Sequence, residues 1–130
     1  MAPSLHQSLL TVSDLETSVA FYEDVIGLET TQEKETNVEF ETGQCTLVLE
    51  EDFDEDVLEA FGLSEPGDVR GEGVIVAIEV DDADDVDEIH QRAEDEGVTV
   101  RMEPKDVSWG RRMMLLADPD EYTIEISSPL

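Results

Sequence analysis

The chain has 130 residues and a formal net charge of −28, which comes from 35 Asp and Glu residues against 7 Lys and Arg residues. This length allows one domain, or two small halves that share a core. The acidity excludes nucleic acid as a partner, because phosphate contacts need clustered Lys and Arg, and it argues against binding to anionic membrane surfaces.

The first half of the chain has the pattern of a strand, a helix and three further strands. We expect the first strand over Leu5–Val12. Ser13 and Glu16 have the spacing of a capping box, which predicts a helix from there to about Ile26, ended by Gly27. Three short strands are predicted to follow, at residues 28–31, 37–41 and 45–50.

The pattern restarts after an acidic segment that predicts a short surface helix and a glycine-rich loop. A strand is expected over residues 73–80, and a helix begins at Asp81 or Asp82 and ends at Gly97. Strands follow at residues 98–102, which Pro104 is expected to end, at residues 111–117 and at residues 122–128. Each half therefore reads β-α-β-β-β, which predicts an α+β fold by internal duplication. One domain over residues 1–130 is expected, with module one at 5–50, a linker with a short helix at 51–72 and module two at 73–128.

Several stretches resemble one family. Residues 10–28, LTVSDLETSVAFYEDVIGL, are similar to the first strand–helix unit of the vicinal oxygen chelate superfamily, which includes glyoxalase I, bleomycin-resistance proteins and extradiol dioxygenases. The family's C-terminal signature is resembled by Glu103-Pro104, Trp109-Gly110-Arg111, Asp118-Pro119-Asp120 and Ile124-Glu125-Ile126. The resemblance implies two βαβββ modules with curved mixed sheets around a cleft, helices on the outer face, and a homodimer.

The family's metal-dependent members place up to four ligands on strand positions that face the cleft. By resemblance these positions are Gln7, Val48, Ile75 and Glu125. Gln and Glu suit a divalent Mn, Fe, Ni or Zn ion, but Val48 and Ile75 have no ligand atom, and two ligands rarely hold a transition metal tightly. Glu50 and Glu79 share faces with Val48 and Ile75, but they lie about 7 and about 13 Å further along their strands.

Other residues of the expected cleft have two interpretations each. Glu125 is either a general base or an acid that hydrogen-bonds to Gln7 without chemistry. One of Arg111 and Arg112 faces the cleft in a regular strand, next to Trp109, the only tryptophan. That arginine either binds a carboxylate or enolate oxygen, with the ring stacking on the ligand, or neutralises nearby acids.

Three functions stay open. The first, which we favour because Leu9, Val48 and Ile75 give the cleft a hydrocarbon lining, is binding of a small molecule without a tightly bound metal and thus without a cofactor. The second is a metal-dependent lyase, isomerase or dioxygenase that uses Gln7 and Glu125. The third is a non-catalytic domain that binds a partner protein.

The remaining composition bears on the environment of the protein. The sequence lacks a basic leader and a long apolar stretch, so we expect a cytoplasmic protein. Acidity with only two lysines, Lys34 and Lys105, resembles the proteins of halophiles that accumulate salt. At molar salt the Debye length is about 3 Å, so self-repulsion is largely screened. An acidic protein from an ordinary environment is the alternative.

Overall fold

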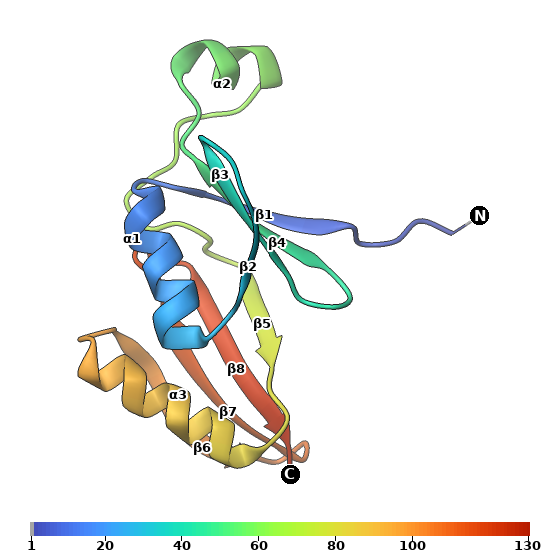
Figure 1. Cartoon of the computed structure of the whole chain (residues 1–130), viewed down its shortest axis with the longest axis vertical. Helices are drawn as coiled ribbons and strands as arrows, with labels where there is room; N and C mark the ends of the chain where they lie inside the picture. The colour runs from blue at the N-terminus through green and yellow to red at the C-terminus, as the bar shows by residue number, and fades with distance from the viewer. Residues whose placement is uncertain (1) are drawn as a thin grey trace. The chain divides into compact units, whose positions relative to one another are not determined.

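The computed structural model describes residues 2–130. The chain divides into two compact units, one ending at Pro66 and the other covering Gly67–Leu130, and each is described by itself. Each unit contains a four-stranded mixed sheet and a helix that crosses it (Figure 1). The predicted α+β fold of two βαβββ modules is confirmed. Within residues 2–130, no helix has the length and apolar character needed to cross a membrane.

The first unit contains one sheet, in the strand order β1-β4-β3-β2. Its elements are β1 (Gln7–Val12), α1 (Leu15–Ala20), a π-helical turn η1 (Phe21–Ile26), β2 (Thr30–Glu33), β3 (Asn37–Glu41), β4 (Thr46–Glu51) and α2 (Glu55–Phe61). β1 is parallel to β4, and the other pairs are antiparallel. A parallel pair needs a crossover, which α1 and η1 provide. Leu10, Val12, Leu47 and Leu49 are buried on one face, as their alternation predicts.

The ends of the first helix differ from the prediction. The capping box at Ser13 is wrong: the N-cap is Asp14, whose carboxylate accepts a hydrogen bond from the backbone N–H of Thr17 at 3.2 Å. Gly27 ends the helix as predicted, in a left-handed conformation with φ of 94°. Because the N–H groups of Gly27 and Leu28 both bond to the carbonyl of Tyr22, the helix cap occupies Leu28, and β2 begins at residue 30 rather than 28.

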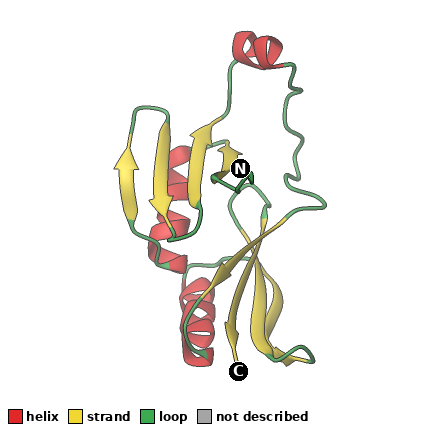
Figure 2. Ribbon diagram, turned by 90° about the vertical axis from the view of Figure 1, so that its right-hand side faces the viewer, coloured by secondary structure: helices red, strands yellow, loops and turns green. Residues whose placement is uncertain are grey.

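The second unit repeats the topology of the first, in the order β5-β8-β7-β6 with β5 parallel to β8. Its elements are β5 (Ile75–Glu79), α3 (Ala83–Asp95), β6 (Val100–Val107), β7 (Arg111–Ala117) and β8 (Thr123–Pro129). Figure 2 shows the helix of this unit on one face of its own sheet. Val86, Ile89 and Ala93 form the buried stripe of α3, and Ile124 and Ile126 of β8 are fully buried.

Two boundaries of the second unit are informative. Asp82 is the N-cap of α3 and forms a capping box with Asp85, which settles the choice between the two candidate caps. The prediction that Pro104 ends a strand is wrong, because β6 continues to Val107. Proline is tolerated there because β6 is an edge strand and its register with β7 shifts between Met102 and Lys105, which is a β-bulge.

Candidate functional site

One face of the second sheet turns away from α3, and we call it the helix-free face. The strand register aligns Glu79 with Ser127 on β5 and β8, and Glu125 with Leu115 on β8 and β7. Because successive side chains alternate between faces, the helix-free face holds the odd-numbered residues of these strands. Those used below are Ile75, Glu79, Arg111, Leu115, Glu125 and Ser127.

Arg111 connects the polar residues of this face. Its Nη2 donates to Oε2 of Glu79 at 2.6 Å and to Oγ of Ser127 at 3.1 Å, and its Nε donates to the same Oγ at 3.2 Å. The hydroxyl of Ser127 donates in turn to Oε2 of Glu125 at 3.3 Å. Ser127 is buried, whereas the carboxylate of Glu79 is largely exposed. The four side chains form one continuous polar chain, which we call the Arg111 cluster.

Arg112 has the opposite orientation. Its guanidinium donates to Oδ1 of Asp87 on α3 at 3.0 and 2.9 Å, and to Oδ1 of Asp106 on β6 at 3.1 Å. The hydrogen bonds to Asp87 and Asp106 raise the pKa of Arg112 above its ordinary value, and Asp87 has the larger effect. The sequence left open which arginine faces away from the helix. The structure places Arg111 on the helix-free face and Arg112 against α3.

The predicted residues of the first module lie on the face of its sheet opposite to the one that carries Leu10, Val12, Leu47 and Leu49. Leu9 pairs with Val48 in the β1–β4 register, and Gln7 is the first residue of β1. Leu9 is 42% exposed and Val48 is buried. Glu39 of β3 lies directly opposite Val48. The sequence reasoning missed this carboxylate, because it becomes visible only once β3 and β4 are placed in register.

The four family positions occupy equivalent places in the two sheets. Gln7 and Ile75 are the first residues of β1 and β5, and each pairs with the first residue of the parallel neighbour. Val48 and Glu125 are the third residues of β4 and β8. Each sheet therefore carries one side chain with a ligand atom and one hydrocarbon side chain. The side chain with the ligand atom is Gln7 of β1 in the first unit and Glu125 of β8 in the second.

The two carboxylates that the sequence suggested as substitutes already have partners. Oε1 of Glu50 accepts a hydrogen bond from the amide of Asn37 at 3.3 Å, and Glu79 is paired with Arg111. With hydrocarbon at two positions and these carboxylates engaged, the donor set at the family positions does not fit a tightly held divalent metal.

Trp109 lies in the turn between β6 and β7 and is 67% exposed. It lines a hollow of about 320 Å³. The other residues of this hollow are Met102, Lys105, Asp106, Val107, Ser108 and Met113. The structure thus places Trp109 at the tip of a hairpin, while Glu125 and Arg111 are brought together through Ser127. Ser127 was missed by sequence reasoning, and its signal was its position two residues after Glu125 on the same strand.

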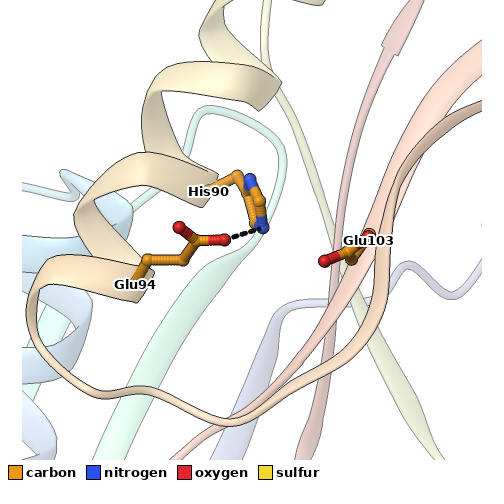
Figure 3. Close-up of side chains that lie close together, drawn as sticks. All are labelled: His90, Glu94 and Glu103. Atoms are coloured by element: carbon orange, nitrogen blue, oxygen red, sulfur yellow. Dashed lines mark ion pairs between the residues drawn. The ribbon is translucent and has the colours of Figure 1, made fainter.

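A second group of side chains lies between α3 and β6. His90 and Glu94 of α3 and Glu103 of β6 each offer a ligand atom, and these three atoms lie within 4.8 Å of one another (Figure 3). The sequence reasoning did not identify this group, in which His90 is half-buried. The four-residue spacing from His90 to Glu94 was the available signal, because residues at i and i+4 share a helix face.

Comparisons with known proteins agree with this fold. A crystal structure of a glyoxalase/bleomycin resistance protein/dioxygenase from Nocardioides is 24% identical with a TM-score of 0.75, covering 100% of this chain and 85% of the other. A family enzyme from Burkholderia phytofirmans PsJN is 20% identical with a TM-score of 0.80, at 98% and 100% coverage. Lactoylglutathione lyase from Agrobacterium tumefaciens is 22% identical with a TM-score of 0.71, at 98% and 95% coverage.

No curated protein sequence shows a significant match to the chain. The structural likenesses, all below 25% identity, show the fold alone. The family itself is shown by a sequence model that matches residues 4–126, nearly the whole chain. The chain therefore belongs to the glyoxalase/bleomycin resistance protein/dioxygenase superfamily.

Proposed function

We propose that this chain binds a cationic small molecule with an apolar body, and that binding requires no metal at the family positions. The observation that carries the proposal is the Arg111 cluster, in which one guanidinium faces two carboxylates, Glu79 and Glu125. One negative charge is left in excess. A pocket without net charge would not favour cationic over neutral ligands, whereas the excess negative charge here favours a cation or a strong hydrogen-bond donor.

The contacts within the cluster assign that excess charge to Glu125. Arg111 contacts Glu79 directly at 2.6 Å, but it reaches Glu125 only through the hydroxyl of Ser127. A carboxylate has about four acceptor positions, so Glu125 keeps acceptors for a ligand. Ile75, which is 56% exposed, and Leu115, which is opposite Glu125 in the register, offer apolar surface for the body of the ligand.

By family resemblance, the ligand-binding positions of the first module are Gln7, which would offer a hydrogen bond, and Leu9 and Val48, which would offer apolar surface. In the second module, Trp109 would stack on a ligand. In this proposal the two modules act as a single domain over residues 1–130, with the linker at 51–72. Assembly as a homodimer, a cytoplasmic location and adaptation of the acidic surface to high salt belong to the same proposal, and light scattering of the purified protein tests the dimer.

The binding test uses ammonium ions that carry N–H donors and an apolar body, for example benzylammonium, measured by calorimetry in molar KCl with EDTA present. A hydrogen bond to a charged group contributes roughly 1.5–3 kcal/mol, so Glu125→Gln should weaken binding by at least about tenfold. Glu88→Gln, an equal charge change at an exposed position of α3, is the matched control and should bind as the wild type does.

Three results would contradict the proposal. Unchanged binding in Glu125→Gln would show that the cation does not contact this carboxylate. Binding that disappears in EDTA, returns with Mn²⁺, Ni²⁺ or Zn²⁺ and depends on both Gln7 and Glu125 would instead favour the metal-dependent lyase, isomerase or dioxygenase. Failure of all ammonium probes, together with capture of a defined protein, would favour a partner-binding domain.

A further inference from the structure

The side chains between α3 and β6 form a site that the proposed function does not use. We infer that His90, Glu94 and Glu103 bind a divalent transition-metal ion, with Zn²⁺ as the representative, and thereby clip the last turns of α3 to the edge strand β6. None of these residues is at a family ligand position, all of which lie on other strands.

The elements bring the three ligands together for separate local reasons. His90 and Glu94 are one turn apart on α3 and point to the same side of the helix (Figure 3). Glu103 lies in the stretch of β6 where the register with β7 shifts. A bulge re-aims a side chain, and here Glu103 points from its strand toward His90 and Glu94 (Figure 3). Their ligand atoms lie within 4.8 Å of one another.

The histidine supplies an observation that the acidic composition does not explain. Nε2 of His90 is buried and makes no hydrogen bond of ordinary geometry, and it is paired with Oε1 of Glu94 at 3.0 Å (dashed line in Figure 3). Zn–N and Zn–O bonds are about 2.0–2.2 Å long, so two atoms bound to one ion at 90–110° lie about 3.0–3.4 Å apart. The separation of Nε2 and Oε1 thus matches two ligands of one ion, and a shift of the exposed Glu103 side chain would bring in the third.

The electrostatics of the site favour a divalent cation. The two carboxylates of the site carry negative charge, and His90 and Glu94 lie near the C-terminal end of α3, where the helix dipole favours cations. Among residues 2–130, no ion pair joins Glu103 to a Lys or Arg side chain. The imidazole distinguishes the site from Mg²⁺ and Ca²⁺ sites, which are built from oxygen ligands, and favours Zn²⁺, Ni²⁺, Co²⁺ or Mn²⁺.

The first test measures Zn²⁺ binding by calorimetry in molar KCl with excess Mg²⁺, which suppresses loose association with surface acids. His90→Gln and Glu103→Gln should each weaken binding by at least about tenfold, since loss of groups that only orient a metal ligand already costs 10–100-fold. Glu88→Gln removes a carboxylate from the same helix but outside the cluster, and it should bind Zn²⁺ as the wild type does. Equal affinity in all four proteins would overturn the inference.

The second test needs no substitution and therefore does not depend on the variants folding. The chain contains two histidines, His90 and His6, so the ring ¹⁵N resonances in an NMR spectrum are readily assigned. Addition of Zn²⁺ should shift Nε2 of His90 and leave both ring nitrogens of His6 unchanged. A shift at His6 alone, or Zn²⁺ binding that is lost in Glu125→Gln and kept in His90→Gln, would place the ion elsewhere and overturn the inference without affecting the test with ammonium ions.

Discussion

Arg112 is expected to hold α3 and β6 together, and its replacement measures how much this connection stabilises the second unit. The guanidinium makes three hydrogen bonds to two carboxylates, Asp87 and Asp106, whose side chains are 50% and 61% exposed. Such partly exposed ion pairs contribute roughly 0.2–1 kcal/mol each. Arg112→Met keeps the apolar stem but leaves two carboxylates that shared one cation, so we expect a loss of about 1–2 kcal/mol.

The assay is urea unfolding, which leaves ionic strength unchanged, in the lowest KCl concentration at which the wild type is folded. With a denaturant slope of roughly 1–3 kcal/mol/M, a loss of this size lowers the midpoint by about 0.3–2 M. A double-mutant cycle with Asp87→Asn isolates the contact and should give a coupling of about 0.5–1 kcal/mol. Molar KCl should reduce this coupling, because the pair is largely accessible to salt.

Arg112→Lys is the informative control, because it keeps the charge but loses the planar fork that reaches two carboxylates at once. Its midpoint should lie between those of the wild type and Arg112→Met. If Arg112→Met unfolds at the wild-type midpoint, or if the cycle with Asp87→Asn shows no coupling, then the connection between α3 and β6 does not stabilise the unit and the reasoning fails.

Three further predictions concern stability. Gly71→Ala should lower the free energy of unfolding more than Gly73→Ala does, by about 1–2 kcal/mol. Both glycines have positive φ, 73° and 83°, but an added Cβ at Gly71 would lie 2.6 Å from the ring of Tyr122, whereas one at Gly73 meets nothing within 4 Å. Equal urea midpoints for the two variants would contradict the contact with Tyr122. Asp118→Ala should lower the free energy of unfolding by about 1–3 kcal/mol in the same assay, because the buried carboxylate accepts hydrogen bonds from the backbone N–H groups of Asp120 and Tyr122, both at 2.9 Å. An unchanged stability would show that water replaces the carboxylate as the acceptor. The thermal midpoint of the wild type should rise steeply with KCl, since 35 acids face 7 basic residues, and a flat response up to molar salt would refute adaptation to salt.

The fold was predictable because its strongest signals are periodic and occur twice. The strands β3 and β7 begin and end at the predicted residues, and α3 begins after one of its two predicted caps. The errors fall where a local hydrogen bond competes with the pattern. Asp14 rather than Ser13 caps the first helix, since either side chain can accept the bond and only the backbone conformation chooses between them.

The candidate site was less predictable, because it depends on contacts across strands. Glu125 and Arg111 were recognised separately, but only the register of β7 with β8 reveals Ser127 between them. Glu103 illustrates a second reason why site residues could not be predicted from the sequence. In a regular strand the faces alternate, and a bulge changes which face a residue occupies without leaving a mark in the hydrophobic pattern.

The duplication constrains what the family positions can do. Because Gln7 is equivalent to Ile75, and Val48 to Glu125, each sheet carries a ligand atom at a different position of the same pair. Two donors fall short of the three or four ligands that hold a transition metal. The retained polar residue of the second sheet is instead tied into the Arg111 cluster. The carboxylate of Glu125 can attract a cation without the help of a metal. We therefore expect the ligand itself to place its cation at Glu125.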